Sequence, residues 1–253
     1  MKCMLVKFLR PEHVSGFLDG SLFFMNTGFF IDLEKNGQNK GIGDKYEGSH
    51  FKLLDPKNDI LKIKIDGEYH TIPIKRGFAT HSLDWVRSLL LNCFTIINLN
   101  DPNDKSSDIY LDYCEDLGGD VCKIKPSILD SLEKEFEGRI PVLIHNTELF
   151  FRRLDAKTKK IFYRRSAVEY FDEYSNYPLS YEEVKKDFYK TLFYKRKFYE
   201  NQKEYRIILA NPKGLDFSTI EIGDLRDCAR QLESIQDLRG IFITTGATEE
   251  HSI

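Results

Sequence analysis

The apolar and polar positions of the first thirty residues follow the order strand, helix, strand. Residues 4–8 and 21–25 are apolar runs of strand length. Between them, Pro11 begins a segment whose apolar residues are spaced i, i+3 and i+4, and Gly20 follows its last turn. Proline at the first helical position and glycine just past the end are typical helix boundaries, so the segment predicts a short helix.

The clearest pattern of the chain lies at residues 61–74. Apolar and basic residues alternate in its first half, and Asp66-Gly67 divides it in two. Alternation broken by Asp-Gly is the strongest short-range signal for a β-hairpin. Alternate residues of a strand face opposite sides, so we expect the three aliphatic residues to be buried and the two lysines to contact water (Leu61, Ile63 and Ile65; Lys62 and Lys64).

Longer elements are predicted in the second half of the chain. Ser180 and Glu183 form a capping box, and an apolar stripe at helical spacing predicts a helix from there to about residue 198. Residues 204–209 are typical of a strand, and residues 224–235 of an amphipathic helix.

Two single residues add to this picture. Pro141 lacks the N–H that a central strand donates, which places the strand predicted at 140–144 on a sheet edge. Trp85, the single tryptophan, lies at helical spacing from Leu89, and we expect it in the core.

The strands and helices do not follow the regular rhythm of parallel βαβ units, and the hairpin is antiparallel. The pattern predicts an α+β fold of mixed, largely antiparallel sheets with flanking helices. No linker, repeat or low-complexity tract divides residues 1–253, which indicates a single domain.

Composition narrows the class of protein. Of the 253 residues, 41% are hydrophobic and 13% aromatic, which is enough for a substantial core. The net charge of −3 excludes a globally basic nucleic-acid binder, although it allows a local basic strip. The chain shows no apolar run of about 18 residues and no signal peptide, so we expect a cytoplasmic protein without membrane contact. The five cysteines and six histidines lack metal-ligand spacing, which indicates no metal site.

Two segments carry residues suited to chemistry. Residues 41–48 combine glycines with Asp44 and Tyr46, which suits either a solvated turn or contacts to a ribose, a base or a phosphate. Gln202 and Glu204 stand two apart at the start of a predicted strand, so we expect them on one face. Such a carboxylate can stabilise the oxocarbenium cation that forms as a glycosidic bond breaks, while the amide holds an acceptor. The alternative interpretation is that Gln202 and Glu204 simply belong to the exposed polar face of a strand.

Basic and aromatic residues are interleaved at residues 157–165 and 194–199. In the second segment, Lys195, Arg196 and Lys197 could neutralise phosphates while the aromatic rings stack on bases. Acidic residues nearby dilute the charge, so a solvated face is the alternative. A nuclease built on Asp108, Asp112 and Glu115 lacks a recognisable ligand spacing.

Taken in order, these motifs resemble an uncharacterised family of bacterial and phage proteins. The resemblance rests on the opening strand up to Arg10 with its helix and Gly20, on the loop at 43–48, on the Cys-Phe strand at 92–95, and on the segment from Lys195 to Arg206.

The same layout resembles the ADP-ribosyltransferase fold, which implies NAD as cofactor. It also implies that the first strand and the strand at 204–209 are neighbours, so that Arg10, Tyr46 and Glu204 line one cavity. The resemblance also implies roles for single residues. Lys7 or Arg10 would contact the NAD phosphates, and Asp44 and Tyr46 would make further contacts to the cofactor. Gln202 would orient the acceptor, and Glu204 would bind the nicotinamide ribose.

Two classes of function therefore stay open. The first is an NAD-consuming enzyme that modifies a macromolecular acceptor, as an effector or counter-defence factor in conflict between bacteria and phages. The second is a non-catalytic inhibitor or adaptor that binds a host complex handling nucleic acid, through the basic and aromatic patches.

Overall fold

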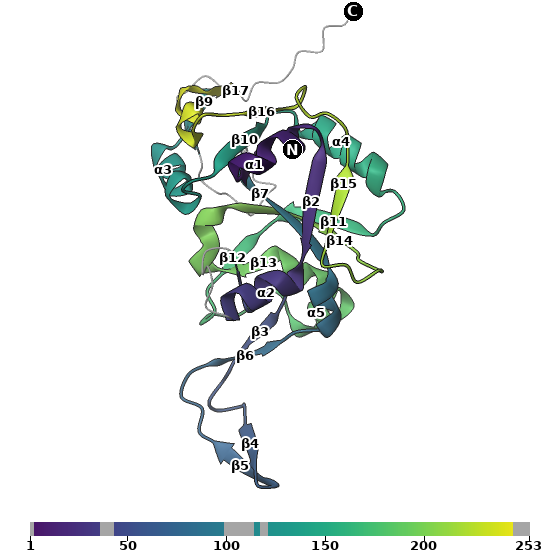
Figure 1. Cartoon of the computed structure of the whole chain (residues 1–253). Helices are drawn as coiled ribbons and strands as arrows, with labels where there is room; N and C mark the ends of the chain where they lie inside the picture. Colours follow the sequence, from purple (N-terminus) through teal and green to yellow (C-terminus); the bar gives the residue numbers. More distant parts are fainter. Residues whose placement is uncertain (1–2, 36–42, 99–113, 117–120, 245–253) are drawn as a thin grey trace, which may run out of the picture.

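The computed structural model of the chain describes residues 3–35, 43–98, 114–116 and 121–244 (Figure 1). Asp108 and Asp112, two of the acidic residues considered for a nuclease, lie outside these ranges. Among the described residues, no helix combines the length and apolar character needed to cross a membrane.

A large antiparallel sheet forms the centre of the molecule. Within the described residues it has eight strands, six of them in the order β11-β14-β7-β1-β10-β16, while β2 pairs with β7 and β15. The fold is thus mixed, with largely antiparallel sheets, as the sequence predicts. The strands are β1 (Cys3–Leu9), β2 (Ser21–Asn26), β7 (Leu90–Asn98), β10 (Ile140–Ile144), β11 (Tyr163–Ala167), β14 (Glu204–Leu209), β15 (Phe217–Glu221) and β16 (Ala229–Gln231).

Smaller sheets surround this one. Three are antiparallel, and β12 with β13 forms a parallel pair. Their strands are β3 (His50–Leu53) with β6 (Phe78–His81), β4 (Leu61–Ile65) with β5 (Glu68–Ile72), β8 (Cys114–Asp116) with β9 (Val121–Ile124) and β17 (Phe242–Thr244), and β12 (Glu169–Phe171) with β13 (Tyr194–Arg196).

Helices cover both faces of the large sheet. The α-helices are α1 (Pro11–Leu18), α2 (Thr27–Lys35), α3 (Pro126–Glu135), α4 (Thr147–Thr158) and α5 (Tyr181–Lys186). Four further segments are 3₁₀ helices: η1 (Asp84–Ser88), η2 (Phe188–Phe193), η3 (Lys197–Gln202) and η4 (Ile235–Gly240).

Alternate residues of the central strands enter separate cores, as strand geometry requires. On one face, Leu5 of β1 packs with α1 and α4; we call this the α1/α4 face. On the other face, Val6 of β1 packs with α3, and Ile208 of β14 packs with α5 and η2; we call this the α3/α5 face. Burial on both faces makes the central strands apolar along most of their length.

The hairpin at 61–74 forms, but its burial differs from expectation. β4 and β5 pair across Asp66 and Gly67, whose φ values of 49° and 91° fit a tight hairpin turn. Leu61, Ile63 and Ile65 are nevertheless 44%, 44% and 49% exposed, so the prediction of a buried face is wrong. The hairpin projects beyond β3 and β6, away from the rest of the molecule (Figure 1). Alternating apolar and polar residues predict that a strand has two different faces, but they do not predict whether other parts of the protein bury either face.

Two predicted helices are replaced because strand pairing prevails over local pattern. After the Ser180 capping box, α5 ends at Lys186, and Asp187 forms an ion pair with Arg164 of β11 at 2.5 Å. The chain then continues through η2 and β13, and the predicted stripe Val184, Phe188 and Leu192 is buried all the same. Residues 224–235 also form no helix, because β16 pairs with β10 there.

The same strand overturns the expected edge position of β10. β16 pairs with Val142–Ile144 and stops short of Pro141, so the missing N–H falls just beyond that pairing. The prediction that Trp85 lies in the core is also wrong. Trp85 is partly exposed on η1, where its ring packs against Phe188 and Tyr189.

Candidate functional site

The two motif segments, residues 43–48 and 195–206, meet in a network of buried charges on the α3/α5 face. Arg206 of β14 lies at its centre and is 1% exposed. Its guanidinium donates to both carboxylate oxygens of Glu47, to Glu204 Oε2 at 2.9 Å and to the carbonyl oxygen of Leu192. A two-pronged guanidinium–carboxylate pair of this kind is among the strongest side-chain interactions in proteins.

Glu204 is held by two cations. Its Oε2 accepts from Lys195 Nζ at 3.2 Å and from Arg206 Nε and Nη2 at 3.1 and 2.9 Å. Burial opposes ionisation of Glu204, but Arg206 and Lys195 outweigh it and lower its pKa to about 2. The carboxylate is therefore fully charged at neutral pH.

Gln202 and Glu204 come together, although for a different reason than strand alternation. Gln202 ends η3, and Lys203 after it adopts a left-handed conformation with φ of 48°. The pair converges because Lys195 Nζ donates to both, reaching Gln202 Oε1 at 2.8 Å. The amide of Gln202 donates in turn to Glu135 of α3 at 3.0 Å.

Asp44 joins the network through the neighbouring arginine. Arg196 donates to Asp44 at 2.8 Å and to Glu34 of α2 at 2.9 Å, and Tyr199 donates to the carbonyl oxygen of Gly43 at 2.7 Å. Asp44 also accepts from the backbone N–H of Tyr46, which fixes the turn. One oxygen of this buried carboxylate, Oδ1, thus accepts from Arg196 and from the turn itself, and Arg196 and Tyr199 fasten the 43–48 segment to β13 and η3.

Packing explains the glycines of this segment. A Cβ at Gly43 would lie 2.7 Å from the backbone of Phe30 and Glu34, and Gly48 has a φ of 64° with its hydrogen facing Val86 and Leu192. Both positions therefore require glycine for close approach of the chain. The glycines give no sign of a phosphate-binding loop.

Tyr46 lies outside the charged network, in an aromatic cluster. Its ring packs edge-on against Phe51 of β3 and Phe78 of β6, with centroid distances of 5.4 and 5.7 Å. The guanidinium of Arg196 lies 5.0 Å from the centre of the same ring. Tyr46 is thereby linked to Asp44 through one shared arginine.

Neither Lys7 nor Arg10 forms a hydrogen bond or ion pair with Glu204 in the described structure, although Glu204 acts electrostatically on Lys7 through the sheet. β7 lies between β1 and β14, so the expected neighbours are not paired, and Lys7 alternates with Val6 onto the α1/α4 face while Glu204 is on the opposite face. Arg10 is exposed at the start of α1. The structure brings together Gln202, Glu204 and Asp44 with its partners, and leaves both proposed phosphate contacts elsewhere.

Lys7 occupies a fork in the large sheet. β7 pairs with β1 through Thr95 and the residues after it, and with β2 through Leu90 and Leu91. In the interval, Lys7 Nζ donates to Asn92 Oδ1 at 2.5 Å and to the carbonyl oxygen of Cys93 at 2.6 Å. The ammonium takes the place of a missing strand partner.

This position of Lys7 predicts a rise in stability at alkaline pH. Burial lowers the pKa of Lys7 from 10.5 to about 8, although Cys93 and Glu204 oppose the shift. Between pH 8 and 10.5 the unfolded chain holds a proton that the folded chain has lost, so the free energy of unfolding should rise with pH, by on the order of 3 kcal/mol in total. Cys93 and Cys228, whose pKa values burial raises, oppose this rise above pH 9, so the contribution of Lys7 is measured as the difference between wild type and Lys7→Met. In urea titrations this difference should grow from pH 8 to pH 10. Lys62→Met, at an exposed lysine, should show no such growing difference; an unchanged slope in Lys7→Met would contradict the assignment.

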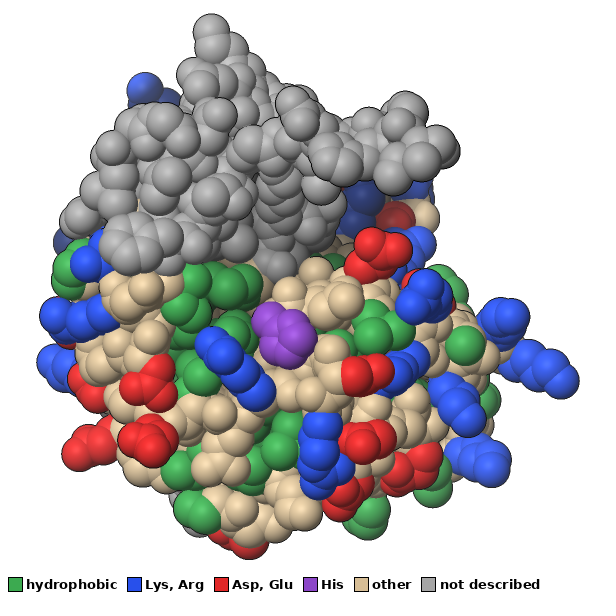
Figure 2. Space-filling view, turned by 90° about the horizontal axis from the view of Figure 1, so that it is seen from above, with side chains coloured by type: hydrophobic (Ala, Val, Ile, Leu, Met, Phe, Trp, Pro, Cys, Tyr) green, Lys and Arg blue, Asp and Glu red, His purple; other side chains and the backbone are tan. Residues whose placement is uncertain are grey.

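The basic segment 195–197 does not present three cations to solvent. Lys195 is 2% exposed and Arg196 is mostly buried, each in ion pairs, while Lys197 is exposed. In the segment 157–165, Arg164 and Arg165 pair with Asp187 and Asp155. Figure 2 shows basic and acidic side chains interspersed over the described residues of one face. These contacts weaken the expectation of a nucleic-acid-binding strip.

No protein-family model matches the chain, and no curated protein or solved structure matches it either. The function therefore has to be inferred from the residues and their geometry.

Sequence reasoning missed Glu47 and Arg206 as the central pair of the network, and Glu34 and Tyr199 as its supports. Each has a charged or polar side chain within or beside a motif, which was the available signal; their pairing across about 150 residues could not be read from one sequence. No group of three or more His, Cys, Asp or Glu among the described residues could hold a metal ion. Buried ion pairs of this kind fasten segments together, and the network's clearest role is to hold residues 43–48 against β13 and β14.

Proposed function

We propose that the protein acts by binding another protein, as an inhibitor or adaptor, and that the projecting β4–β5 hairpin is its binding element. The observation that carries the proposal is the exposure of one aliphatic face of the hairpin. Contiguous exposed apolar side chains are typical of interaction sites.

The pairing register gives the hairpin two different faces. Leu61 lies opposite Ile72, Ile63 opposite His70 and Ile65 opposite Glu68, so the aliphatic side chains share one face. The other face carries Lys62 and Lys64, with Lys64 Nζ 5.6 Å from the centre of the Tyr69 ring. One face is mainly aliphatic, with His70 and Glu68 beside the aliphatic residues, and the other is basic and aromatic.

The base of the hairpin is held firmly. Phe51 of β3 is buried against Phe78 of β6, Phe171 and Tyr177, at centroid distances of 5.2, 4.9 and 5.9 Å. The backbone N–H of Leu54 donates to Gly77 O at 2.9 Å where the strands leave the body. A two-stranded hairpin is marginally stable alone, so this anchor and a bound partner would both stabilise it.

The chemistry of the hairpin favours a protein with a narrow groove, apolar on one wall and acidic on the other. Aliphatic side chains cannot stack on bases, and Asp66 and Glu68 at the tip would repel phosphates. Four aliphatic side chains give far less area than the ~800 Å² per partner of a standard interface. A second copy packed on this face alone would be too weak, whereas a groove can enclose both faces.

A photo-crosslinking residue at Ile63 tests the proposal in cells that make the protein. We expect one crosslinked protein species at Ile63 and none at Phe198, which is also exposed but lies on η3. The identified partner should then bind the purified wild type, and bind Ile63→Ser at least tenfold more weakly, because the apolar contact is lost. Phe198→Ser should retain wild-type affinity.

The same experiment can overturn the proposal. An equal crosslinking pattern at Ile63 and Phe198, or equal affinity of Ile63→Ser, would show that the hairpin is ordinary surface. A crosslink to a second copy of the chain, with a dimer in solution that Ile63→Ser abolishes, would replace the partner protein by self-association. Since Ile63 is exposed, Ile63→Ser should change the free energy of unfolding by less than about 0.5 kcal/mol.

NAD-dependent ADP-ribosyl transfer is a second candidate, supported by one observation. Among the described residues, every donor to Glu204 binds Oε2, which leaves Oε1 as an acceptor for a ribose hydroxyl. Incubation of the purified protein with NAD and a cell extract should then release nicotinamide. If no nicotinamide is released with any of several extracts as the source of acceptor, protein binding remains as the single candidate function.

A further inference from the structure

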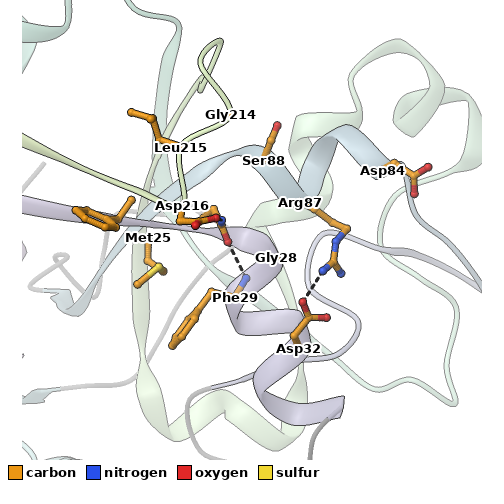
Figure 3. Close-up of a pocket in the computed structure, with 12 residues that line it drawn as sticks. Met25, Gly28, Phe29, Asp32, Asp84, Arg87, Ser88, Gly214, Leu215 and Asp216 are labelled. Carbon is orange, nitrogen blue, oxygen red and sulfur yellow. Dashed lines mark hydrogen bonds and ion pairs between the residues drawn. The ribbon is translucent and has the colours of Figure 1, made fainter.

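A second surface feature lies apart from both the charged network and the hairpin. A cavity of about 640 Å³ opens between the end of β2, the first turns of α2, η1 and the turn that precedes β15 (Figure 3). Its volume is within the ~300–1,000 Å³ range of ligand pockets in proteins.

The walls of this cavity are fastened to one another. Asn211 donates to Ser88 O at 2.8 Å and to Leu215 O at 2.7 Å, and accepts from Leu215 N at 3.0 Å. Asn26 of β2 donates to Asp216 at 3.1 Å. Four polar contacts thus hold the 211–216 turn in place, so the cavity is formed before any ligand binds, which lowers the entropic cost of binding.

One part of the lining is apolar and open to solvent. Phe29, Leu215 and Phe217 line the cavity and are exposed. The ring of Phe217 stacks on Phe23 of β2 at a centroid distance of 5.5 Å, which extends the apolar surface beyond the rim. Clustered exposed aromatic side chains are typical of binding surfaces.

The other part of the lining is acidic. Three aspartates line the cavity (Asp32, Asp84 and Asp216) together with one cation, Arg87, which pairs with Asp32 at 2.5 Å. In the part of the chain that the structure describes, Asp84 and Asp216 have no cation within ion-pair distance. Asp216 lies beside Leu215 in the apolar patch, whereas Asp84 lies on η1 at the far end of the cavity, beyond Arg87 (Figure 3).

We propose that this cavity docks a segment of a partner protein in which a lysine or arginine stands next to a large apolar side chain. The apolar side chain would pack on Phe29, Leu215 and Phe217 while the cation pairs with Asp84 or Asp216. Charge complementarity decides the class of partner, because the aspartates would repel phosphates and anionic lipid head groups. This proposal does not depend on the proposed role of the hairpin, because different substitutions test the two surfaces.

Fluorescence anisotropy with a labelled hexapeptide that contains Arg-Phe-Lys tests the proposal. Saturable binding to the wild type is expected. It should weaken at least tenfold in Phe217→Ser and in the double variant Asp84→Asn/Asp216→Asn, which keeps side-chain size and the acceptor for Asn26. Peptides with Glu for the cations, or Ser for Phe, should bind at least tenfold more weakly. Phe198→Ser and Ile63→Ser should bind the probe like the wild type.

Other outcomes would overturn the proposal. No saturation at millimolar protein, or equal binding of the Glu-substituted peptide, would show that the charge pattern selects nothing. Binding that survives both cavity variants but is lost in Ile63→Ser would place the peptide on the hairpin, which refutes the cavity and leaves the hairpin proposal standing.

Discussion

Replacement of Arg206 by methionine is expected to lower the free energy of unfolding by about 3–5 kcal/mol, the largest effect of any substitution considered. Methionine matches the aliphatic stem of arginine but lacks the guanidinium, which leaves Glu47 and Glu204 as buried carboxylates without their principal cation. It also leaves the Leu192 carbonyl without its donor. Urea denaturation followed by circular dichroism measures the loss, and Trp85 fluorescence gives a second probe.

The matched control is Arg226→Met. Arg226 also pairs with two carboxylates, Asp19 and Asp224, but is half exposed, so water screens its ion pairs and its loss should cost far less than that of Arg206. The double variant Glu47→Gln/Arg206→Met should be more stable than Arg206→Met alone, because it removes the buried charge of Glu47, whereas Glu204 still pairs with Lys195. A loss in Arg206→Met no larger than that of the control would show that water reaches the network and screens it.

The sequence predicts the local elements of this fold well where pattern and tertiary contacts agree. β1, α1 and β2 form nearly as the hydrophobic spacing indicates, with Val14 and Phe17 buried, and β14 begins at Glu204. Prediction from the sequence fails where residues with helical spacing pair instead with a strand that is distant in the chain. The buried stripe of α5 and η2 and the apolar residues on either side of β16 have a spacing that also suits a helix, and only pairing with β10 makes residues 229–231 a strand.

The candidate site shows the same limit. Single residues suited to chemistry can be identified from the sequence, and Gln202 and Glu204 do lie together. The residue that joins them is Lys195, which the sequence pattern assigned instead to a basic strip. What the sequence could not show is that their charges are already used within the protein. Whether a carboxylate faces a cleft or a buried arginine depends on residues far away in the chain, here Glu47 and Arg206. For the hairpin, likewise, the pattern predicts two faces but not that both contact water.

Glu204→Gln is expected to make the protein less stable at neutral pH, and to change how its stability depends on acid. Burial raises the pKa of Glu204, but Arg206 and Lys195 dominate and hold it at about 2, compared with 4.5 in the unfolded chain. The lowered pKa contributes stability that is present above pH 4.5 and is lost as the pH falls through 2, because only the unfolded chain is protonated in that interval. A shift of this size corresponds to about 3 kcal/mol for a group that is 12% exposed.

Urea titrations of wild type and Glu204→Gln at pH 7 and at intervals from pH 4.5 to 2 measure this contribution. The difference in unfolding free energy should be largest at pH 7 and shrink steadily below pH 4.5, because the other carboxylates titrate alike in both proteins. Glu221→Gln on β15, an exposed carboxylate that accepts from Ser21, should change stability by less than about 0.5 kcal/mol at any of these pH values. A pH-independent difference would show that Glu204 acts through shape alone. A nicotinamide-release assay on folded Glu204→Gln then separates the two functions. Release by the wild type and none by this variant would assign the chemistry to the negative charge of Glu204, because loss of fold has been excluded in the same sample.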